Sequence, residues 1–268
     1  MRIASLSPAA TEILFAMGMG NDIVCTDQFS NFPDDARAIP HLRDMVNIDT
    51  SALRGFQPDI VVLGTSIQKR LAEKLKTEDF AVLFEDPRTL QEIYAWIRSL
   101  GAVFDCGRQA ESVVLGMQQS INEVKKKAAL LPRRIRVYIE EWPAIAPSAS
   151  LGATAGTHDL PYASGNWVPE IARIAGCHPF PVNAGDLSSA VTLEQVAAFD
   201  PDMIVISWCG AGSLADKALL MERPEWGQLR AVQSGAVRVI DDSFLNRPGP
   251  RLVEGARHLY GWAFEMLH

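Results

Sequence analysis

A short pattern of polar and apolar positions occurs twice in the chain, once in each half. Segments 53–63 (LRGFQPDIVVL) and 196–206 (VAAFDPDMIVI) both run from the end of a helix through a Pro-Asp turn into a continuous apolar stretch. A continuous apolar run rich in β-branched residues is typical of a strand buried on both faces of a parallel sheet. The repetition therefore predicts two copies of one α/β unit.

The elements around this pattern also repeat. Apolar strands are predicted before it at 2–6 and 136–139, and after it at 81–86 and 236–242. A helix follows the first strand in each half, and in the second half, at 168–176, it comes after a long loop. The shared order of strand, helix, strand, helix and strand predicts an α/β fold of two Rossmann-like lobes, each built on a parallel central sheet.

The segment between the two halves has a helical period. Its apolar residues recur every three or four positions and its polar residues occupy the opposite face, until Pro132 ends the pattern. A helix of this length spans roughly 35 Å, and it joins the lobes more rigidly than a Gly/Ser linker would. The sequence thus predicts an N-terminal lobe at 1–106, a connecting helix at 107–131 and a C-terminal lobe at 132–268, with a ligand cleft between the lobes.

Composition restricts the class of partner. The chain has 268 residues, of which 48% are apolar, a formal net charge of −7 and a pI near 5.3. This acidic balance gives no reason to expect nucleic acid or an anionic membrane as a partner. No apolar stretch approaches the roughly 20 residues of a transmembrane helix. We therefore expect a protein that does not insert into a membrane. We also expect a monomer.

The first strand begins at Arg2, so the chain shows no secretory signal. We expect a cytoplasmic protein, or a periplasmic or extracellular one if the chain is a trimmed mature form. The four cysteines are far apart and show no paired C-x-x-C spacing, which indicates idle or buried thiols in place of a zinc site or disulfides. They are Cys25, Cys106, Cys177 and Cys209.

The turn after the first strand is a candidate binding site. Ser7 suits the N-cap of the following helix and Pro8 its first position. Backbone N–H groups there would point beyond the strand ends, where open α/β sheets bind ligands. The alternative is that these two residues only start a helix. Neither of the glycine-rich phosphate-binding motifs occurs in the chain.

Several further motifs resemble one protein family. They are SLSPAATE at 5–12, FSNFP at 29–33, the two Pro-Asp strands, the long helix, SGNWVPE at 164–170 and RPGPR at 247–251. Their order and spacing, from residue 2 to about 265, are similar to those of the helical-backbone (class III) substrate-binding proteins of metal-chelate ABC uptake, and most of all to the cobalamin-binding proteins. The resemblance implies binding without catalysis and without a cofactor of the protein's own. The ligand would be cobalamin or a related corrinoid, with haem or a ferric siderophore as alternatives, held between two rigid lobes and delivered to an ABC transporter permease.

The resemblance also implies particular ligand contacts. It places aromatic residues at Phe29 and Phe244, and both are aromatic in this chain. Tryptophans that the family pattern places near Met45 and at Gly64 are absent. The remaining candidate contacts at these motifs are Met45, Thr65 and Arg247.

Aromatic side chains would make suitable walls for such a ligand, because a corrin ring is a broad apolar disc fringed with amides. Trp142 follows the Glu140-Glu141 strand end, Trp167 stands beside Asn166 at a helix start, and Trp208 follows the second Pro-Asp strand. For Trp167 and Trp208, ordinary core packing is the alternative. Core or surface positions are expected for the remaining tryptophans, which are Trp96, Trp226 and Trp262.

The segment 143–163 is longer than the corresponding loop expected in close relatives, and loops of this length are commonly functional or disordered. It begins at the carboxyl end of a strand and could lie across the cleft. His158, next to Asp159, is a candidate contact to cobalt or iron, since a carboxylate can orient a metal-binding histidine. The alternative is a solvated loop.

Two other function classes remain open. Glu140-Glu141 or Asp241-Asp242 could be the acid/base pair of a two-lobed enzyme such as a glycosyltransferase or a chelatase. Adjacent carboxylates at strand ends are more often solvated or capping groups, and no nucleophile motif accompanies them. The five histidines are scattered, so a dedicated metal-ion site is not indicated.

In the cobalamin-binding relatives each lobe carries an exposed Glu seven positions before the Pro of its Pro-Asp strand, and this pair docks onto arginines of the permease. The second lobe of this chain keeps it as Glu194, but the first has Ser51, with Asp49 two positions earlier. Loss of one charged contact weakens steering and docking. We therefore hypothesise a corrinoid carrier or sensor in the cytoplasm, with uptake through a permease as the close alternative.

Overall fold

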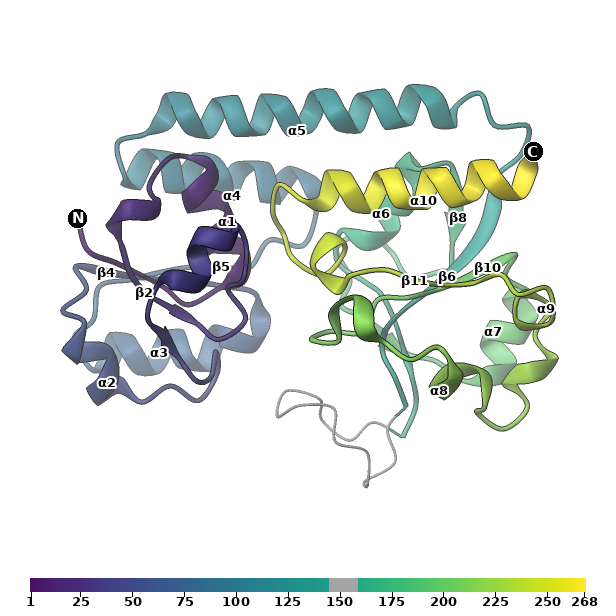
Figure 1. Ribbon diagram of the computed structural model, residues 1–268, viewed down its shortest axis with the longest axis horizontal. Coiled ribbons are helices and arrows are strands. Elements are labelled where there is room, and N and C mark those ends of the chain that lie inside the picture. The colour runs from purple at the N-terminus through teal and green to yellow at the C-terminus, as the bar shows by residue number, and fades with distance from the viewer. Residues whose placement is uncertain (145–158) are drawn as a thin grey trace. The chain divides into compact units, whose positions relative to one another are not determined.

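The computed structural model describes residues 1–144 and 159–268. The chain divides into a first unit, Met1–Gly116 with Pro248–Pro250, and a second unit, Met117–Arg247 with Arg251–His268 (Figure 1). The predicted long helix is present as α5, Gly107–Ala128, but the division into units falls within it. Each half of α5 buries its own apolar residues, such as Val114 in the first and Ile121 in the second.

The first unit is built on a five-stranded parallel sheet. Its strand order is β3-β2-β1-β4-β5, and every neighbouring pair is parallel. The strands are β1 Ile3–Ser5, β2 Ile23–Asp27, β3 His41–Leu42, β4 Ile60–Gly64 and β5 Val82–Glu85.

Helices cover both faces of this sheet, with α1 and α4 on one side and α2 and α3 on the other (Figure 1). Leu53 of α2 and Leu75 of α3 pack in one apolar cluster with Ala4, Leu6 and Val61 of the strand region. The strands are therefore buried on both faces, as their continuous apolar runs predict. The helices are α1 Pro8–Ala16, α2 Thr50–Gly55, α3 Lys69–Thr77 and α4 Leu90–Val103, and the 3-10 turns are η1 Gly20–Asp22, η2 Asp34–Ala38 and η3 Ser66–Gln68.

The second unit has a parallel core of four strands in the order β11-β10-β6-β8. Two short strands extend it, because β7 pairs antiparallel with the end of β6, and β9 pairs antiparallel with β7. The strands are β6 Ile135–Trp142, β7 Tyr162–Ala163, β8 Cys177–Pro179, β9 Ser189–Ala190, β10 Met203–Ile206 and β11 Val237–Val239. Two parallel-sheet lobes are thus confirmed.

One apolar core of the second unit lies on one face of this sheet. Tyr138, Ile204 and Val237 of the strands pack there with Val196 of α7 and Leu220 of α8. The helices are α6 Val168–Ile174, α7 Leu193–Phe199, α8 Ala218–Met221, α9 Arg230–Gln233 and α10 Leu252–Leu267, and the 3-10 turns are η4 Gly212–Leu214, η5 Trp226–Gln228 and η6 Asp242–Phe244.

The repeated Pro-Asp pattern has the same structural role in both units. The Asp59 carboxylate accepts the backbone N–H of Arg2 at 2.7 Å, and the Asp202 carboxylate accepts that of Arg136 at 2.7 Å. The guanidinium of each arginine donates to a carbonyl oxygen at the end of the preceding helix, that of Phe56 or Phe199. The duplication that the sequence predicts is therefore also a duplication of hydrogen bonds.

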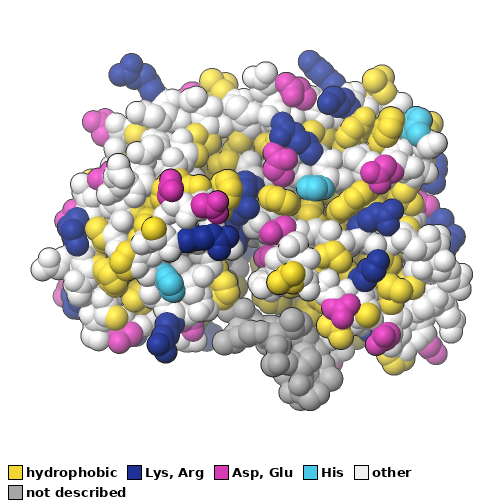
Figure 2. All heavy atoms as spheres, in the orientation of Figure 1, with side chains coloured by type: hydrophobic (Ala, Val, Ile, Leu, Met, Phe, Trp, Pro, Cys, Tyr) yellow, Lys and Arg dark blue, Asp and Glu magenta, His cyan; other side chains and the backbone are white. Residues whose placement is uncertain are grey.

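Charged side chains of both signs are interspersed on the face drawn in Figure 2. This distribution fits a moderately acidic protein and contrasts with the single-sign surface of a nucleic-acid binder. In the part of the chain that the structure describes, none of the helices has the length and apolar character needed to cross a membrane.

Candidate functional site

Each sheet has one topological switch point, where the strand order reverses. Open α/β sheets bind ligands at this point, outside the carboxyl ends of the strands. In the first unit this point lies between β1 and β4, and in the second between β6 and β10. The first edge is defined here by the residues that follow the strands of the first unit: Leu6, Phe29, Phe32, Met45 and Thr65. The second edge is defined by Glu141, Asn166, Cys209, Asp242, Phe244, Asn246 and Arg247.

One buried amide ties the first edge together. The side chain of Gln68 accepts the backbone N–H of Gly64 at 2.9 Å and donates to the carbonyl oxygens of Leu6 and Met45, at 2.5 and 2.8 Å. Gln68 therefore joins the ends of β1 and β4 to the loop after β3. No local pattern in the sequence singles out this residue, because its role depends on three segments meeting in space.

A chain of hydroxyl groups fixes the turn after β2. The Ser5 and Thr11 hydroxyls lie 2.8 Å apart, those of Thr11 and Ser30 lie 2.9 Å apart, and Ser30 donates to the Asp27 carboxylate at 2.6 Å. Asp27 also accepts the backbone N–H of Phe29 at 2.7 Å. The 29–33 turn is thus held at the first edge by buried polar groups.

This turn carries two aromatic rings. Phe29 is half-buried, while Phe32 is 42% exposed. Sequence reasoning identified Phe29 but missed Phe32, although both stand in the same FSNFP motif. An exposed aromatic side chain at the carboxyl end of a strand is a suitable surface for a flat ligand.

Thr65 follows β4 with φ 78° and ψ 151°. That region of backbone space is almost restricted to glycine, and for a β-branched residue it is an outlier. The backbone N–H of Thr65 donates to the Glu85 carbonyl oxygen at 3.0 Å, which ties it to β5. The half-buried threonine is therefore strained at the first edge.

Ser7 is the N-cap of α1 and Pro8 stands in its first turn, as the sequence predicts. Both residues are buried, and no side-chain capping hydrogen bond is made by Ser7. A Cβ atom at Gly64 would lie 2.9 Å from the ring of Trp96 and 3.3 Å from the Ser7 hydroxyl oxygen. Trp96 from α4 thus occupies the space that a side chain at position 64 would need.

In the second unit, Glu140 is a fully buried carboxylate with four donors. Arg223 donates two hydrogen bonds to it, at 2.8 and 2.6 Å, Trp208 one at 2.8 Å and Tyr138 one at 3.0 Å. The indole of Trp208 is 1% exposed, so the structure places this candidate ligand contact in the core. Core packing, the alternative given for it, accounts for its position.

Trp167 is also a buried residue, 3% exposed, and its indole N–H donates to the Leu245 carbonyl oxygen at 2.6 Å. Packing accounts for it as well. The neighbouring Asn166 is half-buried with φ 53°, and its backbone N–H donates to the Asp186 carbonyl oxygen at 2.5 Å. A Cβ atom at Gly165 would lie 2.4 Å from the backbone of Leu187, so only glycine allows this close approach.

The second edge contains the carboxyl group of Glu141. Glu141 accepts hydrogen bonds from the Ser188 hydroxyl and from the Cys209 thiol. Burial raises the pKa of Glu141 above its usual value of 4.5, against the effect of these donors. Burial, and then the nearby Glu141 and Asp242 charges, raise the pKa of Cys209 well above its usual value. The thiol is therefore neutral at physiological pH.

Asp242 and Phe244 form η6 beside this group. Asp242 accepts the backbone N–H groups of Gly210 and Gly212 at 3.0 and 2.8 Å. Burial raises the pKa of Asp242, and the charge of Arg247 opposes this rise. Arg247 itself is half-buried.

Phe244 is half-buried and already has neighbours within its own unit. Its ring stacks on that of His258 with centroids 5.6 Å apart, and the Arg251 guanidinium lies 5.5 Å from its centroid. Trp142 ends β6 opposite Tyr162 of β7 and is half-buried. His158 lies outside the described residues, as does most of the 143–163 segment, whose end forms β7.

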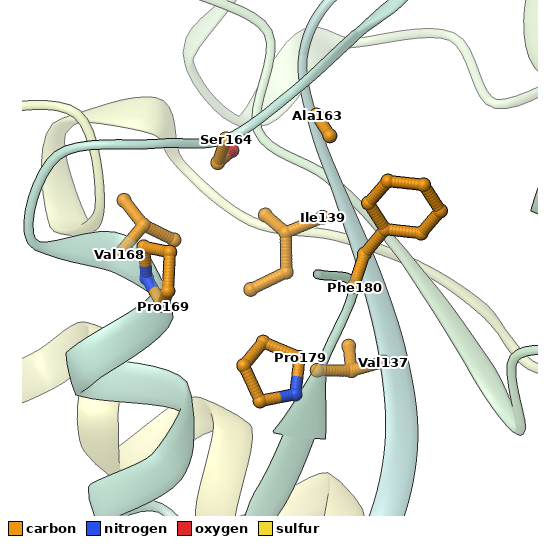
Figure 3. A pocket seen from close by; sticks show the side chains of 8 residues that line it. All are labelled: Val137, Ile139, Ala163, Ser164, Val168, Pro169, Pro179 and Phe180. Atoms are coloured by element: carbon orange, nitrogen blue, oxygen red, sulfur yellow. The ribbon is translucent and has the colours of Figure 1, made fainter. Parts of the chain in front are cut away.

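An internal cavity of about 10 Å³ lies between β6, β8 and α6 (Figure 3). The Ser164 hydroxyl is buried there without a hydrogen-bond partner. The space holds at most one water molecule, so it is not a site for a metal chelate. Its lining consists of Val137, Ile139, Ala163, Ser164, Val168, Pro169, Pro179 and Phe180. Among the described residues, no group of three or more His, Cys, Asp or Glu side chains is placed to hold a metal ion.

The candidate docking residues occupy matched positions. Ser51 is the second residue of α2, Glu194 is the second residue of α7, and both are exposed. Asp49 caps α2, and hydrogen bonds led by the Ser51 hydroxyl lower the pKa of Asp49. A hydrogen bond from Thr192 lowers the pKa of Glu194. Each helix start therefore carries an ionised carboxylate at neutral pH.

Two parallel-sheet α/β units, each with a candidate ligand edge at its reversal point, are the architecture of a two-lobed binding protein. The chain matches the family described as periplasmic binding protein over residues 3–244 and belongs to that family. The resemblance to class III substrate-binding proteins of ABC uptake systems is thereby confirmed. These are binding proteins and not enzymes.

The chain is similar to known proteins along nearly all of its length. It is 24% identical over 266 residues to the uncharacterized ABC transporter substrate-binding lipoprotein YvrC of Bacillus subtilis, covering 96% of this chain and 78% of that protein. It is 25% identical over 262 residues to a vitamin B12-binding protein of Photorhabdus laumondii, covering 97% and 86%. Its fold matches the periplasmic heme-binding protein RhuT of Roseiflexus with a TM-score of 0.83 at 19% identity, covering 100% and 99%.

Proposed function

We propose that this protein binds a corrinoid, cobalamin or cobinamide, with the first edge as its leading contact surface, and delivers it to the permease of an ABC transporter. The observation that carries the proposal is the 29–33 turn, where the hydrogen-bonded chain from Ser5 to Asp27 positions Phe29 and an exposed Phe32. Membership of the periplasmic binding protein family and the similarity to a vitamin B12-binding protein support it.

The chemistry of the two edges suits such a ligand. The first edge offers aromatic and apolar side chains, Phe29, Phe32 and Met45, to the flat apolar part of the ring. In the second unit, the second edge carries polar groups of the kind that bind amides, among them Asn166 and Arg247. Aromatic walls with a few fixed polar groups are typical of small-molecule sites.

Haem is the competing ligand, because structural relatives include a heme-binding protein. Haem iron is normally held by an axial His, Met, Cys thiolate or Tyr side chain. Of the residues that define the two edges, only Met45 and Cys209 belong to these types, and Cys209 is a neutral thiol. A corrinoid brings its own axial ligands and requires none from the protein, which favours it here.

For delivery, we propose that Glu194 and Asp49 are the groups that meet the permease. Both are exposed carboxylates at helix starts, with lowered pKa values. In this proposal, Asp49 takes the role of the glutamate that the family pattern has at the position of Ser51. We expected a cytoplasmic carrier from the N-terminal sequence. Membership of the family and the similarity to a lipoprotein favour instead a role in uptake outside the cytoplasm.

Substitution of the edge aromatics tests the proposal. Phe32→Ala and Phe244→Ala are each expected to weaken cyanocobalamin binding by roughly tenfold or more, since a lost aromatic contact is worth about 1.5 kcal/mol. Phe264→Ala is the matched control, because Phe264 is 44% exposed on α10 and belongs to neither edge. Equal affinities of all three variants and the wild type, measured by fluorescence quenching, would place the ligand elsewhere.

A further inference from the structure

Three sulfur atoms lie together in the first unit. The Cys106 sulfur is 3.5 Å from the sulfur of Met19 and 3.9 Å from that of Met17. We call Met17, Met19 and Cys106 the three-sulfur cluster. Nothing in the proposed chelate binding uses these residues.

The cluster is separate from the first edge. Helix α1 starts at the carboxyl end of β1, and Met17 lies at its far end as the C-cap. Cys106 lies in the turn between α4, which starts after the carboxyl end of β5, and α5. Both segments therefore meet toward the amino ends of the strands, opposite the candidate ligand edge.

Backbone hydrogen bonds fix the segments that carry the sulfurs. The N–H of Met17 donates to the Ile13 carbonyl oxygen at 3.0 Å, and that of Met19 to the Leu14 carbonyl oxygen at 2.9 Å. The N–H of Cys106 donates to the Gly101 carbonyl oxygen at 2.8 Å. The three side chains are thus presented by ordered backbone on both sides.

The two sulfur separations from Cys106 suit a three-coordinate metal ion. Metal–sulfur bonds of about 2.3 Å in a trigonal plane place the sulfurs about 4.0 Å apart. The Cys106 sulfur lies 3.9 Å from that of Met17 and 3.5 Å from that of Met19, so the separation from Met19 must open slightly. Met19 is half-buried whereas Met17 and Cys106 are buried, so Met19 provides the route of entry.

We propose that the three-sulfur cluster binds a monovalent soft metal ion, Cu(I) in the first place and Ag(I) as its analogue. Soft thiolate and thioether ligands favour Cu(I), Zn²⁺ and iron–sulfur clusters over the harder biological metals. On binding, the Cys106 S–H bond breaks, the proton leaves to solvent and a metal–thiolate bond forms, with no change in oxidation state. One thiolate and two neutral thioethers then leave the buried site uncharged, whereas Zn²⁺ would leave it with a net positive charge that burial disfavours.

The test is an anaerobic titration of the full-length protein with Cu(I) against the chromophoric chelator bathocuproine disulfonate. The wild type is expected to retain one equivalent, and Zn²⁺ is expected not to compete for it. X-ray absorption is expected to show three sulfur neighbours at about 2.3 Å. Failure of the wild type to retain Cu(I) overturns the proposal.

Variants locate the site. Cys106→Ser is expected to lose the retained equivalent, and Met19→Leu, a change that keeps side-chain volume, to weaken it at least about tenfold. Met221→Leu is the control, because Met221 is 39% exposed in α8 of the second unit. Circular dichroism checks that each variant is folded. Undiminished Cu(I) retention by folded Met19→Leu and Cys106→Ser proteins contradicts the assignment.

Discussion

At the scale of single residues, Thr65 shows how the first edge stores strain. Its φ of 78° and ψ of 151° belong to glycine, yet the hydrogen bond to Glu85 holds it there at the end of β4. Such strain costs about 1–3 kcal/mol and persists where the surrounding structure imposes it. Strained residues gather at ligand sites, which is consistent with the place of Thr65 on the first edge.

Thr65→Gly is therefore expected to raise the free energy of unfolding. Relief of about 1–3 kcal/mol of strain outweighs the roughly 0.5–1 kcal/mol that glycine costs through chain flexibility. Thr65→Ala is the matched control, because alanine removes the same hydroxyl and methyl but keeps the Cβ atom that causes the strain. Urea unfolding that finds Thr65→Gly no more stable than Thr65→Ala would show that Thr65 is unstrained.

The raised pKa of Glu141 predicts how the free energy of unfolding depends on pH. Burial raises its pKa in the folded state above 4.5, so the folded protein binds the proton more tightly than the unfolded chain. The stability contributed by that proton is full below pH 4.5 and is lost as the pH rises through the folded-state pKa. As the pH rises through this pKa, the free energy of unfolding of Glu141→Gln is expected to increase relative to that of the wild type. Urea unfolding at a series of pH values measures this.

Glu194→Gln is the control of opposite sign. Hydrogen bonds lower the pKa of Glu194 in the folded state, so its contribution is present above pH 4.5 and is lost as the pH falls through the lower folded-state value. This variant is expected to lose stability relative to the wild type as the pH rises through that acidic window. A Glu141→Gln variant with the same trend as Glu194→Gln would contradict the account of the second edge.

Which residues could be predicted from sequence depends on how local their roles are. Ser7 and Pro8 start α1 as expected, because capping depends on adjacent positions. Trp167 and Trp208 were candidates for ligand contact, but their indoles donate to Leu245 and Glu140 in the core. Their partners are distant in sequence, so burial could not be inferred from local pattern.

At the scale of elements, the second unit is organised around one buried ion pair. Glu140 at the end of β6 receives two hydrogen bonds from Arg223, which follows α8. The side chains are 0% and 11% exposed, and the guanidinium lies 4.8 Å from the ring centroid of Trp226. This pair holds the segment after α8 against the central strand.

Arg223→Met is expected to lower the free energy of unfolding by about 3–5 kcal/mol, because it leaves a buried carboxylate without its counter-ion. Addition of Glu140→Gln is expected to recover part of that loss by removing the charge. Arg257→Met is the control, since the Arg257–Glu254 pair is 48% and 42% exposed and is worth about 0–1 kcal/mol. A loss for Arg223→Met no larger than for Arg257→Met would show that the pair does not organise the unit.

The elements themselves were largely predictable. The two Pro-Asp strands show continuous apolar runs and the long helix shows a helical period, and both signals can be read locally. The structure has these elements as β4, β10 and α5. The short strands β7 and β9 were not predicted, because two residues carry no period and their pairing depends on β6.

At the scale of the whole molecule, duplication explains both the fold and the candidate site. Two copies of one unit place the same type of edge on each lobe, and the matched pairs Arg2–Asp59 and Arg136–Asp202 preserve the same strand connection in both. The identity of the ligand could not be read in the same way. In the proposed site it depends on a few loop side chains, such as Phe32 and Met45, whose exposure and neighbours follow from tertiary structure.

The most direct measurement is calorimetric titration of the purified protein with cyanocobalamin, cobinamide, haem and a ferric siderophore under one set of conditions. We expect one corrinoid molecule bound per chain at micromolar or lower Kd, with haem weaker. Haem binding tighter than that of either corrinoid, and abolished by Met45→Leu, would contradict the corrinoid assignment and identify the protein as a haem carrier.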